Sequence, residues 1–343
     1  MQEKLIDIVK QVAKEKNISA EVIIEALEAS LIMAYKRNFG SANNIRIVNS
    51  DGDWRIFATK VVVDAVVDAK FEIDLASAQK INVKFALGDE IDLEVTPKDF
   101  GRIAAQTAKQ VIIQRLRDAE RNVIYDEYTN RENDILSGKI SRVDQKNVHI
   151  DLGRTEAVLA PSEQIPGERY VLGERIKAYV LEVRKVSKGP QIMVSRTHPG
   201  LLKRLLELEV PEIKEGVVEI KAISREPGSR SKVAVFSRNP EVDSVGACIG
   251  HKGSRVQMIV NELHGEKMDV IRWSEDVAEY IAGALSPAKV ISVTVNAVEK
   301  TSRVVVPDFQ LSLAIGKEGQ NARLAAKLTG WKIDIKSESQ VSE

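Results

Sequence analysis

The sequence contains only one cysteine, Cys248, among its 343 residues. A lone cysteine cannot form a disulfide within the chain, so packing and polar contacts must hold the fold together. This excludes the disulfide-stapled secreted domains and indicates a protein of a reducing compartment. We therefore expect a cytoplasmic location, with Cys248 as a small core residue.

Long apolar runs are also missing. The longest stretches without a charged residue have nine residues, as at 280–288, whereas a helix that spans a bilayer needs about 20 mostly apolar residues. The first residues, Met1 to Asp7, lack the apolar core of a secretory signal. The sequence therefore predicts no membrane association.

No excess of charge of either sign exists, because 50 Lys and Arg residues balance 50 Asp and Glu residues. This balance excludes a globally basic nucleic-acid binder but leaves local basic patches open. Residues 1–130 carry 18 basic and 21 acidic residues, 131–200 carry 12 and 9, and 201–343 carry 20 and 20. Only the middle segment leans positive.

What the chain does have is the length and the apolar content of several globular domains: 43% of its residues are hydrophobic and 29% are charged. Residues 1–130 begin with two helical patterns, the second of which follows Asn17. Short β-rich runs then predict a small sheet; they lie at 45–48, 54–57, 61–63 and 91–95. From Pro97 to about Tyr128 an apolar stripe predicts a helix of roughly 45 Å, either a docking strut or a long core helix.

Residues 135–195 follow a pattern that is entirely β. Five short apolar runs with glycine-bearing turns predict a small closed barrel of the OB type; they are Ser137–Val143, Asn147–Gly153, Glu156–Leu159, Ile176–Val183 and Gln191–Ser195. With its Asp151-Leu152-Gly153 and its closing Val194-Ser195-Arg196, this segment resembles the S1-type RNA-binding OB domain.

An internal repeat is the most specific signal in the chain. Residues 246–253 (GACIGHKG) recur as residues 312–319 (SLAIGKEG). Further on, residues 265–270 (GEKMDV) recur as residues 330–335 (GWKIDI). Two copies of one module are the natural interpretation.

Each copy has the predicted element order αββααβ, with a Gly-x-x-Gly turn between the last two helices. This order, with an isoleucine before the turn, resembles the prokaryotic-type (type II) KH domain. The two glycines let a nucleic-acid backbone approach closely and place helix N-terminal amides beside phosphates, so the turn predicts binding of single-stranded RNA. A glycine pair alone is more often a simple turn, but the duplication and the shared downstream sequence favour the KH interpretation.

The predicted RNA-binding residues lie in the two turns, in the helices that follow them and on the barrel. The first turn supplies Ile249, Gly250, His251, Lys252, Gly253, Ser254 and Arg255. The second turn supplies Ile315, Gly316, Lys317, Glu318, Gly319, Asn321 and Arg323. Lysine and arginine would neutralise phosphates, whereas the acid Glu318 should repel them, so that the second copy binds more weakly or orients the first.

The barrel departs from the S1 pattern at one functional point. Members of the S1 family usually present aromatic residues for base stacking, yet residues 131–200 contain two tyrosines and neither Phe nor Trp. Lys139, His149 and Arg196 lie where the S1 binding face would fall. Each of the three is a predicted RNA contact, with a simple solvated surface as the equal alternative.

Signs of catalysis or of a cofactor are lacking. The Walker-A spacing after Gly246 fails because His251 stands where a glycine would be needed. The four histidines have no companion Cys or His at metal-binding spacing. We therefore expect no enzyme activity, no metal and no other cofactor.

The order of the parts resembles the NusA family of bacterial transcription factors, and the stretch from Asp99 to Gln110 resembles the long N-domain helix of that family. The resemblance implies a multi-domain α+β fold: an N-terminal α/β domain with a long helix, an S1-type OB barrel and two tandem type II KH domains. The expected domain boundaries are 1–130, 131–199, 200–275 and 276–343.

The resemblance also implies a function. Residues 1–130 would dock on bacterial RNA polymerase near its RNA exit channel, and the S1 and KH domains would contact the nascent single-stranded RNA. Such a factor is a non-enzymatic monomer that works with other Nus antitermination factors and alters pausing, intrinsic termination and antitermination.

Two rival interpretations remain. A generic S1/KH RNA-binding protein, acting in translation or as an RNA chaperone, would have the same turns but no affinity for polymerase. RNA-degrading phosphorylases also carry KH and S1 modules, but in the opposite order and behind catalytic domains for which residues 1–130 are too short. This second alternative is therefore disfavoured.

Overall fold

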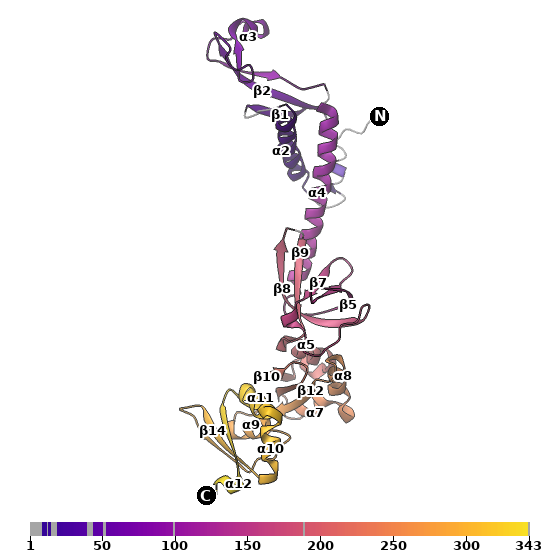
Figure 1. Cartoon of the computed structure of the whole chain (residues 1–343), viewed down its shortest axis with the longest axis vertical. Coiled ribbons are helices and arrows are strands. Elements are labelled where there is room, and N and C mark those ends of the chain that lie inside the picture. Colours follow the sequence, from indigo (N-terminus) through magenta and orange to yellow (C-terminus); the bar gives the residue numbers. More distant parts are fainter. Residues whose placement is uncertain are drawn as a thin grey trace. The chain divides into compact units, whose positions relative to one another are not determined.

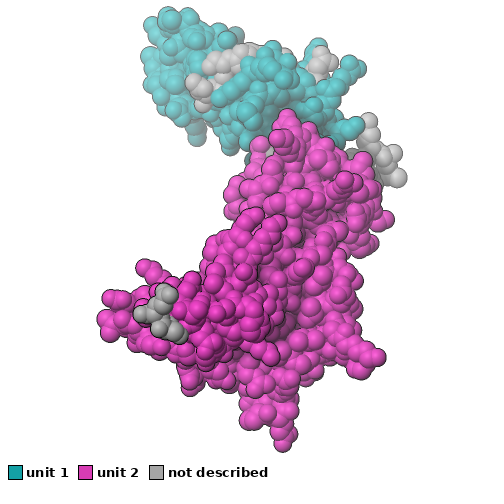
Figure 2. Space-filling view, turned by 60° about the horizontal axis from the view of Figure 1, so that its bottom comes forward, with its two compact units in different colours: residues 1–123 teal, residues 124–343 magenta. Residues whose placement is uncertain are grey.

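The structure is a computed structural model that describes residues 9–11, 13–14, 19–39, 44–50, 53–98, 100–187 and 189–341. Two compact units, Met1–Val123 and Ile124–Glu343, make up the chain (Figures 1 and 2). The 30-residue helix α4 (Phe100–Thr129) begins in the first unit and ends in the second, close to its predicted bounds. The first of the two expected helical patterns, before Asn17, lies mostly outside the described residues.

The first unit packs α2 (Ala20–Phe39) and the first part of α4 against a small sheet (Figure 1). The strands are β1 (Ile45–Ser50), β2 (Asp53–Val63), β3 (Glu72–Asp74) and β4 (Glu90–Glu94). β2 pairs with all three others, antiparallel to β1 and β4 and parallel to β3. Leu31 of α2, Ile56 of β2 and Ala108 of α4 are completely buried, as amphipathic stripes require.

Two details of the first unit differ from the sequence-based expectation. The runs 54–57 and 61–63 form one continuous strand, because the three residues between them include no glycine or proline to interrupt it. A short helix, α3 (Leu75–Ile81), was not expected. Its N-cap Asp74 accepts a hydrogen bond from the backbone amide of Ser77 at 2.8 Å, and this contact holds the pKa of the Asp74 carboxyl below its usual value.

The second unit begins with the barrel, and all five expected strands are present. They are β5 (Ile135–Asp144), β6 (Asn147–Asp151), β7 (Glu156–Leu159), β8 (Arg175–Val186) and β9 (Gly189–Ser195). The strands close in the order β5-β6-β7-β9-β8 (Figure 1). Along β5, Leu136 and Ile140 face the interior and Lys139 faces outward, as the alternation of a half-buried strand predicts.

Two copies of the αββααβ module follow. The first contains α5 (Pro199–Glu209), a short α6 (Pro211–Lys214), β10 (Val218–Glu226), β11 (Arg230–Ser237), α7 (Ser244–Ile249), α8 (Ser254–Glu262) and β12 (Lys267–Arg272). The second contains α9 (Val277–Ala284), β13 (Ser292–Asn296), β14 (Thr301–Val306), α10 (Leu311–Ile315), α11 (Gln320–Thr329), β15 (Lys332–Ser337) and a short α12 (Glu338–Val341). In both sheets the first two strands are antiparallel and the last runs parallel to the middle one, so the sequence repeat is a structural repeat.

Shared apolar cores join the three modules of the second unit. Ile165 and Tyr179 of the barrel belong to the same buried cluster as Leu201 of α5. Ala234 of β11 likewise shares a cluster with Ile281 of α9. Each module therefore completes the core of its neighbour. None of the helices in the described part of the chain is long and apolar enough to cross a membrane.

Candidate nucleic-acid interface

The two Gly-x-x-Gly turns have nearly the same backbone conformation. Gly250 has φ 75° and ψ 175°, and Gly316 has φ 78° and ψ 170°. The third residues of the turns, Lys252 and Glu318, are left-handed, with φ of 52° and 53°. A helix begins directly after each turn, so its first amides have no partner within the helix and lie beside the turn.

The first turn presents positive charge and an apolar edge to solvent. His251 and Lys252 at its tip are exposed, and Ser254 at the start of α8 is exposed too. Ile249, which leads into the turn, is 37% exposed although it belongs to an otherwise packed helix. This combination can hold a phosphate backbone at the tip and a base against the isoleucine.

Arg255 is engaged within the protein. Its Nη1 atom donates to Glu212 Oε2 at 2.9 Å and to the carbonyl oxygen of Ala247 at 2.5 Å. The guanidinium therefore ties the helices on either side of the turn together. Of the two basic residues predicted to supply charge at this turn, Lys252 at the exposed tip makes no ion pair with any residue that the structure describes.

The second turn has the same form but balanced charge. Lys317 and Glu318 are both exposed at its tip, and Ile315 is 37% exposed, like its counterpart in the first copy. Asn321 points inward: it is 6% exposed, and its Nδ2 atom donates to the carbonyl oxygens of Leu285 and Ala314 at 3.0 and 3.1 Å. Asn321 therefore holds α10 in place.

Glu226, at the end of β10, is a residue that no sequence pattern singles out. Its carboxylate accepts hydrogen bonds from Gln320 Nε2 at 2.7 Å and from Arg323 Nε at 3.1 Å, and so connects the first KH module to the helix behind the second turn. Burial alone would raise the pKa of the Glu226 carboxyl, but these hydrogen bonds hold it below its usual value. Because the partners lie 94 and 97 positions away, no local pattern could have revealed the contact.

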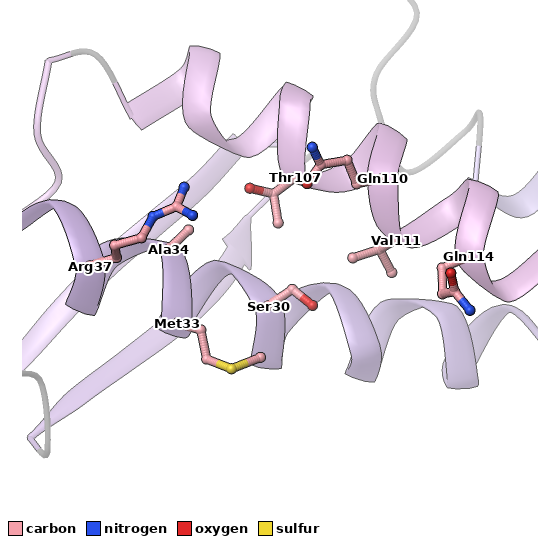
Figure 3. A pocket seen from close by; sticks show the side chains of 8 residues that line it. All are labelled: Ser30, Met33, Ala34, Arg37, Thr107, Gln110, Val111 and Gln114. Atoms are coloured by element: carbon pink, nitrogen blue, oxygen red, sulfur yellow. The ribbon is translucent and has the colours of Figure 1, made fainter. Parts of the chain in front are cut away.

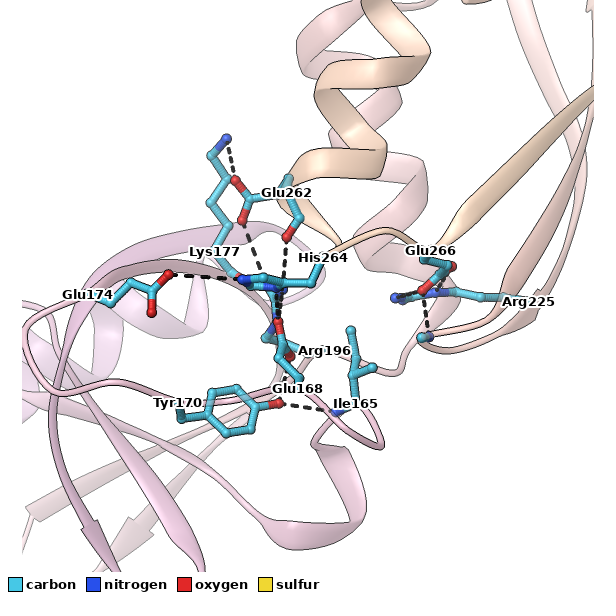
Figure 4. Close-up of polar contacts among 11 residues, drawn as sticks. Ile165, Glu168, Tyr170, Glu174, Lys177, Arg196, Arg225, Glu262, His264 and Glu266 are labelled. Atoms are coloured by element: carbon cyan, nitrogen blue, oxygen red, sulfur yellow. Dashed lines mark hydrogen bonds and ion pairs between the residues drawn. The ribbon is translucent and has the colours of Figure 1, made fainter.

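Arg196 does not lie on the barrel surface, where the sequence placed it. Its side chain is completely buried, with Nε donating to Glu168 Oε2 at 2.8 Å (Figure 4). Further donors bond the carbonyl oxygens of Lys177 and Glu262, the latter at the end of α8. A buried guanidinium needs such partners, and Arg196 finds them because the chain turns there from β9 into the first KH module. It is the polar centre of that joint rather than an RNA contact.

The other two barrel residues differ from each other. Lys139 is exposed on β5, directly opposite Arg175 of β8. The side chain of His149 is only 13% exposed, with Nδ1 3.5 Å from Glu156 Oε2. Burial alone would raise the pKa of the Glu156 carboxyl, but hydrogen bonds from Arg142 and Ser141 outweigh this effect and lower it. Lys139 is thus an open cation, whereas His149 belongs to a polar cluster.

The first unit contains a different kind of site, a cavity of about 450 Å³ between α2 and α4 (Figure 3). Both polar and apolar side chains line it: Ser30, Met33, Ala34, Arg37, Thr107, Gln110, Val111 and Gln114. Met33 is 62% exposed there. Two parallel walls of helix with an exposed methionine form a groove of the kind that accepts a helix or loop of another protein.

Clusters of side chains that could hold a metal ion are not found in the described part of the chain. There, no three or more His, Cys, Asp or Glu side chains come together to hold a metal ion. Cys248 is buried, and burial raises the pKa of its thiol to about 12, so it packs as a core residue.

A barrel followed by two αββααβ modules with exposed Gly-x-x-Gly turns defines a class of RNA-binding protein, and comparisons with known families agree. The NusA N-terminal domain family matches residues 4–122, and the S1 RNA binding domain family matches 129–195. The NusA-like first and second KH domain families match 196–273 and 277–343.

The chain belongs to the NusA family of transcription termination/antitermination proteins. The NusA protein of Halalkalibacterium halodurans is 61% identical over 100% of this chain and 90% of its own length. That of Bacillus subtilis is 58% identical over 100% of this chain and 93% of its own length. The solution structure of the N-terminal domain of NusA from B. subtilis is 54% identical, covers 35% of this chain and 99% of that chain, and has a TM-score of 0.32.

Proposed function

We propose that the chain is a non-enzymatic factor that binds elongating RNA polymerase through residues 1–130 and nascent single-stranded RNA through its S1 and KH domains. On polymerase it modulates pausing, intrinsic termination and antitermination together with other Nus factors. The observation that carries the RNA part is the pair of exposed turns with matching backbones, in a chain of the NusA family. Weak RNA binding by each turn suffices, because docking on polymerase raises the local concentration of the transcript.

Within the RNA site, the first turn does most of the binding. His251 and Lys252 supply donors and charge, and Ile249 supplies an apolar contact for a base. The second turn, with Glu318 at its tip, guides the strand and adds less affinity. Arg255, Asn321 and Arg323 act indirectly, because they hold the turns in shape.

Replacing both His251 and Lys252 by Asp should therefore weaken RNA binding more than the same change at Lys317 and Glu318. Fluorescence titration of a labelled single-stranded RNA measures both losses in the full chain. All four side chains are exposed, so neither variant disturbs a core. Equal losses would contradict the assignment of the main site to the first turn.

The groove between α2 and α4 is the proposed docking site for polymerase. The first 130 residues lean acidic, with 21 acidic and 18 basic residues, so protein docking suits this segment better than nucleic-acid binding. Met33 lies open in the groove and would be covered by the partner.

We expect Met33→Asp to weaken binding of the full chain to core RNA polymerase about tenfold or more, because it places a charge in an apolar contact. RNA binding should not change. The matched control is Val67→Asp, at a residue that is 92% exposed in the same unit and does not line the groove. Loss of binding in both variants, or in neither, would refute the groove as the docking site, and failure of the unchanged chain to bind would refute the role on polymerase.

The non-enzymatic assignment has its own test. Shortening of end-labelled RNA by the protein in the presence of phosphate would refute it.

A further inference from the structure

A small cavity lies where the barrel meets the first KH module. Arg169, Glu174 and Arg175 of the barrel and Asn261, Glu262 and His264 of the KH module are among its walls. Its volume is about 140 Å³, well below the roughly 300 Å³ at which pockets for whole small molecules begin. The cavity therefore suits a single chemical group rather than a nucleotide with its base.

The two arginines of this cavity are available to a ligand. Both side chains are exposed, and neither makes a hydrogen bond or an ion pair with any residue that the structure describes. Lys139, the cross-strand partner of Arg175, is a further exposed cation, although it does not line the cavity. Two open arginines in the cavity, with Lys139 opposite one of them, favour an anionic ligand.

The two carboxylates of the cavity have different surroundings. Glu262 lies 3.2 Å from Lys177 Nζ and 3.6 Å from Arg196 Nη1. Glu174 Oε1 lies 4.0 Å from Nε2 of His264, whose Nδ1 is 2.5 Å from the buried Glu168 (Figure 4). The charge of Glu262 is therefore balanced inside the joint, and two arginines face the single exposed carboxylate of Glu174, so positive charge remains for a ligand.

The position of the cavity relates it to the first Gly-x-x-Gly turn. Helix α8 begins at that turn and ends at Glu262, in the cavity wall, so its nine residues span roughly 13 Å between the two sites. Four exposed side chains point away from the core along this helix, and none is acidic: Ser254, Gln257, Met258 and Asn261. An RNA strand that leaves the turn along α8 meets no negative side chain among them.

We propose that this cavity binds one backbone phosphate of the RNA strand, on the barrel side of the first turn, through Arg169 and Arg175. The inference rests on the proposed RNA-binding function and adds a site to it. Guanidinium groups match the geometry of phosphate oxygens and remain charged at every physiological pH. A barrel without Phe or Trp would then bind RNA through contacts of its arginines with the phosphate backbone, rather than by stacking on bases.

The test is a double variant, Arg169→Gln with Arg175→Gln, in the full chain. Binding is measured over a range of salt concentrations with an RNA of about four nucleotides, which one KH turn can hold, and with one of about ten nucleotides. With the longer RNA, the slope of log affinity against log salt should fall by about 0.7, the value for one phosphate contact on a single strand. With the shorter RNA, affinity and slope should not change.

Arg154→Gln is the matched control, because Arg154 is an exposed arginine of the same barrel that does not line the cavity. An unchanged slope in the double variant would overturn the site. So would an equal loss with the short RNA or in the control, since either would indicate a general charge effect. Competition by inorganic phosphate without any change in the RNA slope would assign the cavity to a free anion and overturn the RNA assignment. If the unchanged chain bound neither RNA, the proposed RNA function itself would fail.

Discussion

Lys232 and Asp269, two charged residues of the first KH module, bond to groups of the protein itself. Lys232 is completely buried, and its Nζ lies 3.1 Å from Asp269 Oδ2 and 2.7 Å from the carbonyl oxygen of Ser286 in the next module. Burial lowers the pKa of Lys232. Burial would raise the pKa of Asp269, but hydrogen bonds and charge from Arg230 and Lys232 hold it below its usual value. Through these hydrogen bonds Lys232 ties Asp269 of the first KH module to Ser286 of the next module.

Replacing Asp269 by Asn should lower the free energy of unfolding by about 3–5 kcal/mol, because it leaves the buried ammonium of Lys232 without its counter-ion. Urea unfolding measures the loss. Lys232→Met is the control: an apolar side chain of similar length needs no partner, so its cost should be much smaller. A larger loss for Lys232→Met than for Asp269→Asn would contradict this account.

The same pair affects stability in acid. Because the pKa of Asp269 is lower in the folded state than its ordinary value of 3.8, the unfolded chain takes up a proton first as the pH falls. The stabilisation is present above that ordinary value and is lost as the pH drops through the folded value. Asp269→Asn should therefore reduce the fall in stability below about pH 4.

At this scale the sequence predicts only part of the site. The exposed tips of the two turns could be found because they recur in the repeat. Arg196 and Asn321 could not be assigned correctly, because whether a polar side chain points outward or inward depends on segments that are far away in the chain. Arg196 bonds Glu168 and the end of α8, and neither contact leaves a local pattern.

Among the structural elements, the Gly-x-x-Gly turn has the strictest requirements. A Cβ atom at Gly250 would lie 2.7 Å from Cγ of Arg255, and one at Gly316 would lie 2.8 Å from the backbone nitrogen of Asn321. A flexible side chain can move aside, whereas backbone cannot. Gly253 and Gly319, which close the turns, have φ of 80° and 75° but more open surroundings.

We expect Gly316→Ala to destabilise the second KH module more than Gly253→Ala destabilises the first. Gly253→Ala carries only the cost of a left-handed conformation, about 1–2 kcal/mol. Gly316→Ala adds a clash with backbone, and its φ and ψ lie in a region used almost only by glycine. Thermal unfolding of the two variants measures the difference, and equal costs would show that the clash is relieved.

The elements that could be predicted from the sequence are those with a strong periodic pattern of apolar residues. The stripe from Phe100 onward gave α4, and the five apolar runs gave the barrel strands. The short α3 was missed because seven residues contain too few turns to show a helical period. The sequence pattern divides β2 into two runs, because Ala58, Thr59 and Lys60 interrupt its large β-forming residues. The strand itself continues through these three residues.

For the molecule as a whole, the contacts between modules matter more than any one turn. Glu226 and Arg323 connect the two KH modules across 97 positions of the chain. Arg323 lies in the first helical turn of α11, directly after the second Gly-x-x-Gly segment. The pair of Glu226 and Arg323 therefore fixes the position of that segment relative to the first KH module.

A charge reversal tests this connection. Glu226→Arg alone and Arg323→Glu alone should each destabilise the second unit, because like charges then meet, and the double variant should recover part of the loss. The expected coupling is about 0.2–1 kcal/mol in a double-mutant cycle, since the pair is partly exposed. Additive losses in urea unfolding would show that the two residues do not interact.

The buried Arg196 also bears on when the barrel can finish folding. The S1 family match ends at residue 195, one position before the arginine that pairs with Glu168 at the joint between the barrel and the first KH module. A barrel cut at that boundary would lose the guanidinium that pairs with the Glu168 carboxylate. We therefore expect a nascent barrel to reach its final stability only after Arg196 and the end of α8 have left the ribosome, because these segments supply the partners of the joint.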